Sequence, residues 1–185
     1  AFRKLPEAFT DFGSLKLLNK YISPLLIISV LTCFVLYYIF KYTDIGRKLI
    51  AAGANPDAAE LSGISVDRMF IYCHMLSGFL AALAGIMLTA RIGAAIPSMA
   101  GHLGFDWLLP AFLAPVLGGT LLSGGKVTVF GTMLGAILVT LINNGLYLID
   151  VGEFWVRFFL GIILLGAVLL DRAREYFTVK NSIVS

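Results

Sequence analysis

The sequence predicts an all-α, polytopic integral membrane protein with about five transmembrane helices, one short helix outside the membrane and one helix broken by proline. Hydrophobic residues make up 59% of the chain and charged residues only 14%, against roughly half and a quarter in an ordinary soluble domain. The apolar residues form five runs, each close to the length of about 20 residues that a bilayer-crossing helix needs. Residues 1–185 are therefore expected to form a single transmembrane domain.

The first two runs cover residues 25–42 and 69–90. The first ends in three tyrosines and Lys41, and such a belt of aromatic and cationic residues is typical of a membrane interface. The second carries glycines and alanines at helical spacing, including Gly78 and Gly85, which favour close packing between membrane helices. Both runs are expected to span the membrane.

A polar loop at residues 43–68 joins these two spans and contains a short helix with a cap at each end. Asn55 is a favourable N-cap residue, Pro56 suits the first helical position, and Asp57 faces the positive end of the helix dipole. Gly63 stands where a left-handed C-cap residue is expected. A helix of about two turns is not stable alone, and its small apolar residues suit docking into a groove of a partner. The residues of this shallow knob are Ala58, Ala59 and Leu61.

The third run, residues 105–122, contains Pro110 and Pro115 and closes with Gly118 and Gly119. Proline inside a helix removes a backbone hydrogen bond and clashes with the preceding turn, so we expect a helix that is not straight and regular. Broken helices inside a membrane occur where protein or a water-filled cavity satisfies the freed backbone groups. This run is therefore the first candidate for lining a pathway through the membrane.

The last two runs, residues 127–149 and 154–170, follow a tight glycine turn at residues 123–126. The first of them contains a GxxxG pattern from Gly131 to Gly135, which is typical of a close helix-packing face. The second is entered through acidic residues, and Glu153 can pair with Arg157 four positions later on one helix face.

Four neutral polar side chains in or beside the spans are further candidates for contact with a transported solute. A route for a polyhydroxylated solute needs such neutral donors and acceptors instead of fixed charge, because the solute must bind weakly enough to leave. The alternative interpretation, hydrogen bonding between helices, remains open for each of them. These residues are Thr120, Ser123, Asn143 and Asn144.

The distribution of positive charge predicts which side of the membrane each loop occupies. Lys41 and the loop at residues 43–68 carry four Lys or Arg, and the tail after Leu170 carries three. Loops rich in Lys and Arg face the cytoplasm, so both segments are expected there. The four later runs then supply the even number of crossings that this arrangement requires.

Several classes of chemistry are excluded by the sequence. The stretch from Thr120 to Val127 has neither the first glycine nor the magnesium-binding Ser or Thr of a phosphate-binding P-loop. Cys33 and Cys73 lie inside apolar runs, so neither a disulfide nor a metal site is expected. The sequence contains no recognisable catalytic set, and a net charge of +3 is too small and scattered to indicate nucleic-acid binding.

In several short sequence motifs taken together, the chain resembles the permease subunits of bacterial ABC importers for monosaccharides, the ribose, xylose and galactose class. The resemblance runs from about residue 8 to residue 170 and covers the C-terminal part of such a permease, so the chain is expected to be a piece of a longer protein. The matching words are Ile45-Gly-Arg47, Ala52-Gly-Ala-Asn-Pro-Asp-Ala-Ala-Glu-Leu-Ser-Gly-Ile64, Leu76-Ser-Gly78, Ala84-Gly-Ile86, Leu117-Gly-Gly-Thr-Leu-Leu-Ser-Gly-Gly125, Gly131-Thr-Met-Leu-Gly135 and Asn143-Asn-Gly145.

This resemblance implies a multi-pass subunit of the bacterial inner membrane that is not an enzyme and holds no cofactor. It implies a second permease subunit, usually an identical one, a periplasmic solute-binding protein, and a separate cytoplasmic ATPase subunit that binds the ATP. In such importers the cytoplasmic loop helix docks onto the ATPase and couples it to transport. The residues that would form this coupling element are Asn55, Pro56, Asp57, Ala58, Ala59, Leu61, Ser62 and Gly63.

Other functions remain open at this point. The same superfamily includes permeases for nucleosides and branched-chain amino acids, so the solute could be of another class. An ATP-independent channel or secondary transporter would use no ATPase, and would favour an ionisable carboxylate deep in a span. If the chain were a purely structural membrane scaffold, the proline-broken run would have no evident purpose.

Overall fold

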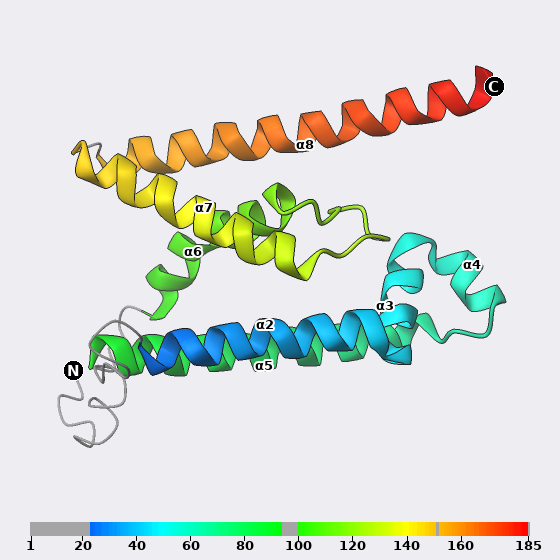
Figure 1. The fold of residues 1–185 in the computed structure, drawn as a ribbon, viewed down its shortest axis with the longest axis horizontal. Coiled ribbons are helices and arrows are strands. Elements are labelled where there is room, and N and C mark those ends of the chain that lie inside the picture. The colour runs from blue at the N-terminus through cyan, green and yellow to red at the C-terminus, as the bar shows by residue number, and fades with distance from the viewer. Residues whose placement is uncertain (1–22, 94–99, 151, 185) are drawn as a thin grey trace. The chain divides into compact units, whose positions relative to one another are not determined.

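The structure is a computed structural model that describes residues 23–93, 100–150 and 152–184. Every regular element within these ranges is a helix (Figure 1). Three of the described helices, α2, α5 and α7, are long and apolar enough to cross a membrane, and a shorter apolar helix covers Gly104–Leu117. The elements are α2 (Pro24–Tyr42), α3 (Asp44–Ala54), α4 (Pro56–Leu61), α5 (Val66–Ile92), α6 (Ala100–Leu117), α7 (Val129–Leu148) and α8 (Glu153–Val184).

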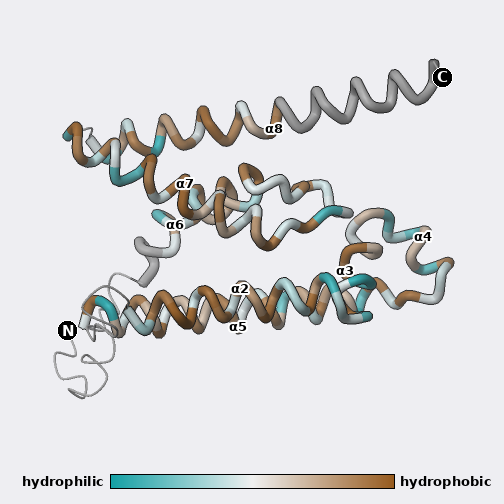
Figure 2. Tube along the Cα trace, in the orientation of Figure 1, coloured by the Kyte–Doolittle hydropathy of each residue, from teal (hydrophilic) through white to brown (hydrophobic). Residues whose placement is uncertain are grey.

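The chain is thus an all-α membrane protein, as predicted. Figure 2 shows apolar residues along α2, α5 and α7, while hydrophilic segments appear in α4 and at the junction of α2 with α3. The bounds of α2 and α5 agree closely with the first two predicted spans. α8 continues well beyond the end expected at residue 170.

The first compact unit, Ala1–His102, holds α2 to α5. Figure 1 shows α3 and α4 together at one end of α2 and α5. The polar loop between the first two spans therefore contains two helices, and the prediction of a single short helix there is incomplete. The missing helix, α3, begins after the N-cap Thr43 with Asp44 in its first turn.

Two features of the sequence indicate α3, the charged residues in its first turn and its amphipathic pattern. Arg47 hydrogen-bonds Asp44 and lowers the pKa of this carboxyl below its usual range, so Asp44 stays ionised at the positive end of the helix. On the other face, Leu49 and Ala52 pack against α4 and α5. An amphipathic pattern after an N-cap threonine indicates a helix of this kind.

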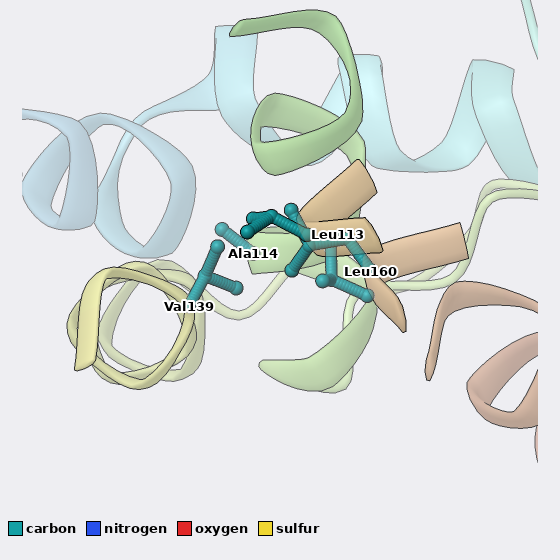
Figure 3. Packing of buried hydrophobic residues seen from close by; sticks show 5 residues of the cluster. Leu113, Ala114, Val139 and Leu160 are labelled. Atoms are coloured by element: carbon teal, nitrogen blue, oxygen red, sulfur yellow. The ribbon is translucent and has the colours of Figure 1, made fainter. Parts of the chain in front are cut away.

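The second compact unit, Leu103–Ser185, has its core where α6, α7 and α8 meet. Leu113 and Ala114 of α6, Val139 of α7, and Val156 and Leu160 of α8 are buried together. Figure 3 shows four of these side chains, Leu113, Ala114, Val139 and Leu160, gathered between the three helices. This cluster fixes the packing of the three helices within the unit.

The GxxxG pattern of α7 packs directly on the backbone of α6 and of Gly118 just after it. A Cβ atom on Gly135 would lie 2.1 Å from the carbonyl oxygen of Ala114, and one on Gly131 would lie 1.9 Å from that of Gly118. No side chain fits at such distances, so both glycines are required for this approach. The predicted role of this pattern as a helix-packing face is confirmed.

α6 differs from the proline-interrupted run expected at residues 105–122. It runs through Pro110 and Pro115 and ends at Leu117, five residues early. The helix ends because Gly119 adopts a left-handed conformation, with φ of +79°, and the N–H of Thr120 returns to the carbonyl of Pro115 at 2.9 Å. The break lies at the glycine pair and not at the prolines.

Candidate functional site

The N-terminus of α4 is capped as the sequence predicts. Asn55 has an extended backbone, and its side-chain oxygen accepts a hydrogen bond from the N–H of Ala58 at 3.1 Å. Pro56 occupies the first helical position and Asp57 the first turn. A side-chain cap and a carboxylate near the positive helix end both stabilise this short element.

The C-terminus of α4 ends in a Schellman motif. Gly63 has φ of +80°, and its N–H bonds the carbonyl of Glu60 at 2.9 Å. The N–H of Ile64 reaches the carbonyl of Ala59 at 3.0 Å, while Ile64 also packs with the buried side of the helix. Gly63 is therefore required at this turn, because other residues rarely adopt this conformation.

The two faces of α4 have different environments. Ala59 is only 5% exposed and lies in a buried cluster with Ala52 of α3 and Val66 and Met69 of α5. Leu61, in contrast, is 91% exposed, and Ala58 is exposed beside it. The expectation that Ala59 belongs to the outward knob is wrong, because short links to α3 and α5 turn this residue inward.

The structure thus presents a helix capped at both ends, whose outward apolar surface includes Ala58 and Leu61. Its polar residues also have defined roles. The hydroxyl of Ser62 donates to the carbonyl of Ala58 at 2.8 Å, which closes the last turn.

The two prolines of the pathway candidates lie inside α6. Because proline has no N–H, Pro110 and Pro115 leave the carbonyls of Asp106 and Ala111 without their usual helical donors. Both prolines are partly buried. These carbonyls are acceptors that a regular helix would not offer.

Thr120 belongs to a hydroxyl cluster at the junction of α6 and α7. Its hydroxyl oxygen accepts a hydrogen bond from the N–H of Thr128 at 3.1 Å and lies 3.1 Å from the hydroxyl of Thr128 and 3.3 Å from that of Thr132. The Thr128 hydroxyl also donates to the carbonyl of Gly118 at 2.6 Å. This network favours the structural interpretation of Thr120, and sequence reasoning missed its two partners.

Ser123 lies on the exposed turn between α6 and α7, not on a helix. The two glycines that follow it, Gly124 and Gly125, have φ of +91° and +83°, as a tight turn requires. The backbone N–H of Leu121 bonds the carbonyl of Lys126 at 3.2 Å across this turn. Ser123 is therefore presented at the end of the helices.

Asn143 and Asn144 differ in their surroundings. The side chain of Asn144 is exposed, whereas the side-chain oxygen of Asn143 is buried and accepts no hydrogen bond within the described residues. A buried acceptor without a donor costs about 1–3 kcal/mol. Asn143 lies about 16 Å along α7 from Thr132, at 1.5 Å per residue, so the polar candidates do not converge on one site.

An ion-pair group that sequence reasoning only partly found joins α6 to α8. Arg157 bonds Glu153 at 2.7 Å, as the four-residue spacing predicts, and also bonds Asp106 of α6 at 2.7 Å. All three side chains are at least one-third exposed. Asp106 lies 51 residues before Arg157, so no local pattern pointed to it.

Within the described ranges, no group of His, Cys, Asp and Glu side chains is placed to hold a metal ion. The features that remain are a helical membrane domain and a capped helix beyond the ends of its spans. Together they define a class, the polytopic helical membrane proteins.

The chain belongs to the family described as branched-chain amino acid transport system / permease component, which matches residues 3–168. It is 40% identical over 148 residues to the ribose import permease protein of Haemophilus influenzae, covering 80% of this chain and 44% of that protein. It is 43% identical over 150 residues to a probable ABC transporter permease protein of Escherichia coli, covering 81% and 43%. The xylose transport system permease protein of Haemophilus influenzae is 38% identical over 166 residues, covering 88% and 43%.

The chain spans less than half the length of the curated relatives it matches. No solved structure matches the chain at a significant level.

Proposed function

We propose that the chain is part of the permease subunit of a bacterial ABC importer that carries a monosaccharide, ribose-like in size and chemistry, into the cytoplasm. The proposal rests on the family and on relatives named as ribose and xylose permeases. In this proposal residues 1–185 belong to one multi-pass domain of the inner membrane, and residues 43–68 form a coupling loop on its cytoplasmic side.

The observation that carries the proposal is the construction of α4. This helix is capped at both ends, anchored by Ala59 on one face, and presents the 91% exposed Leu61 on the other. An apolar groove on an ATPase subunit would remove Leu61 from water. The partner ATPase binds and hydrolyses the ATP, and the permease itself is not an enzyme and needs no cofactor.

The remaining partners follow from the same class of transporter. A periplasmic binding protein would deliver the solute, and a second permease subunit, usually an identical copy, would complete the pathway. Within this chain, α6 with its freed carbonyls and Asn143 with its buried acceptor supply neutral hydrogen-bonding groups. Thr120 is assigned to the packing of α6 on α7 instead.

Reconstituted transport tests this function. The full-length permease and the ATPase subunit encoded by a neighbouring gene are reconstituted in proteoliposomes together with the binding protein. Uptake of radiolabelled ribose, xylose and leucine is then measured with and without ATP. The proposal predicts ATP-dependent uptake of a pentose that unlabelled leucine does not inhibit. Uptake of leucine alone would contradict the sugar assignment, and uptake without ATP would contradict the importer class.

A further inference from the structure

The junction between α2 and α3 is a sharp elbow held by one threonine. The hydroxyl of Thr43 donates to the carbonyl of Ile39 in the last turn of α2 at 2.6 Å. The same oxygen accepts the N–H of Gly46 in the first turn of α3 at 3.2 Å. Thr43 therefore closes one helix and opens the next through a single side-chain oxygen.

Gly46 lets the two helices touch at this elbow. It is buried, and a Cβ atom at this position would lie 2.3 Å from the carbonyl oxygen of Ile39 and 2.6 Å from the Cα atom of Phe40. Both of these are backbone atoms, which cannot move aside without shifting a helix. The first turn of α3 is therefore packed directly on the last turn of α2.

The other end of α3 is attached to α4 and α5. Ala52 of α3, Ala59 of α4, and Val66 and Met69 of α5 form one buried cluster. The links are short, since only Asn55 separates α3 from α4. α3 and α4 thus have two attachments, the elbow at α2 and the buried cluster at the start of α5.

The elbow lies directly beyond the aromatic belt of α2. The ring of Tyr42 contacts those of Tyr37 and Tyr38, with centroids 6.2 and 5.6 Å apart. Tyrosines at the end of a span mark the membrane interface. Thr43 and Gly46 are therefore placed where the spanning helix leaves the membrane.

We propose that Thr43 and Gly46 are positioning residues that make α3 and α4 a rigid lever, so that movement of α4 is passed to α2 as well as to α5. The inference rests on the proposed function, because it takes α4 as the helix that the ATPase moves. With the elbow intact, both spans that flank the loop respond together. With the elbow loosened, α4 moves against α5 alone and ATP hydrolysis is no longer matched to transport.

The test measures how many ATP molecules are hydrolysed for each solute molecule transported. Four variants of the full-length permease, assembled with its ATPase and binding protein, are compared with the unaltered protein: Gly46→Ala, Thr43→Ala, Thr43→Ser and Gly161→Ala. Thr43→Ser keeps the hydroxyl, and a Cβ atom at Gly161 meets nothing within 4 Å, so these two are the matched controls.

Both Gly46→Ala and Thr43→Ala are expected to retain the copurifying ATPase. In Thr43→Ala the ratio of ATP to solute is expected to rise about fivefold, the factor that corresponds to losing one helix cap. In Gly46→Ala it is expected to rise at least as much, because the added Cβ forces the two helices apart. The two controls are expected to keep the ratio of the unaltered protein. Assembled Gly46→Ala and Thr43→Ala complexes with an unchanged ratio would overturn the inference, and so would loss of assembly in both, which would assign these residues to folding alone. Failure of the proposed function shows separately, as absent ATP-dependent uptake in the unaltered protein.

Discussion

Asn55 is the residue on which the shape of α4 depends most directly. Its side-chain oxygen holds the N–H of Ala58, and replacing such a cap with alanine costs about 1 kcal/mol. We expect Asn55→Ala to fray the first turn of α4 and to speed amide hydrogen exchange at Ala58 by about fivefold. Exchange measured by mass spectrometry on the purified permease checks this.

Asn55→Asp is the control for that experiment, because a carboxylate keeps the acceptor and is favoured near the helix N-terminus. Its exchange at Ala58 should match that of the unaltered protein. Equal exchange in Asn55→Ala and the unaltered permease would show that the cap contributes nothing to α4.

Substitution of Asn143 distinguishes the two roles that the sequence leaves open for it, contact with the solute and hydrogen bonding between helices. Its side-chain oxygen is buried and unbonded within the described residues, so replacing it with leucine removes a group that costs about 1–3 kcal/mol. We expect Asn143→Leu to assemble normally and to lower uptake about tenfold, as for the loss of one hydrogen bond to the solute.

The exposed neighbour provides the comparison. Asn144→Leu should leave both uptake and assembly close to those of the unaltered permease. Loss of assembly together with uptake in Asn143→Leu, measured by copurification of the ATPase, would assign Asn143 to packing between helices.

The pairing of α7 with α6 depends on glycine at defined positions. A Cβ atom on Gly135 would meet the carbonyl oxygen of Ala114 at 2.1 Å, whereas one on Gly145, on the same helix, meets nothing within 4 Å. Overpacking of this kind typically costs about 1–3 kcal/mol. We therefore expect Gly135→Ala to lower the thermal unfolding temperature of the detergent-solubilised protein, and Gly145→Ala to leave it unchanged. Equal unfolding temperatures would contradict the packing of α7 on α6 described above.

Local chemistry explains which elements could be predicted. The caps of α4, the glycine turn before α7 and the GxxxG face each depend on a few neighbouring residues, and sequence alone identified them. α3 was missed although Thr43 and Asp44 begin it as an ordinary capped helix. The end of α6 was misplaced because hydropathy continues past Leu117, while the glycine pair that follows stops the helix.

Tertiary contacts explain what could not be predicted. Ala59 was assigned to the outward face of α4, but the short links to α3 and α5 turn it into a buried cluster. Asp106 was not connected to Arg157, because 51 residues separate them and only the packing of α6 beside α8 brings them together. Exposed ion pairs of this kind contribute about 0–1 kcal/mol, so their omission changes little in the energetics.

For the transporter as a whole, Leu61 is the residue expected to matter most to coupling. It is 91% exposed, so Leu61→Glu should leave folding and membrane insertion intact. Burying an unpaired carboxylate in an apolar groove costs several kcal/mol, and we expect ATP-dependent uptake to fall at least about tenfold. Leu61→Met retains apolar volume and should transport normally. Normal uptake by Leu61→Glu would count against docking through this knob.

The central claim is that α4 docks on a cytoplasmic ATPase subunit, and cross-linking tests it most directly. The full-length permease receives Ala58→Cys on the exposed face of α4 and is expressed with the ATPase. Its native thiols are removed by Cys33→Ser, Cys73→Ser and replacement of any cysteine outside residues 1–185. Ala59→Cys, on the buried face, is the matched control. We expect a cross-link from Ala58→Cys whose yield changes with ATP, and none from Ala59→Cys. Labelling of the Ala58→Cys thiol from outside the cell, without any cross-link to the ATPase, would contradict both the sidedness of the loop and its coupling role.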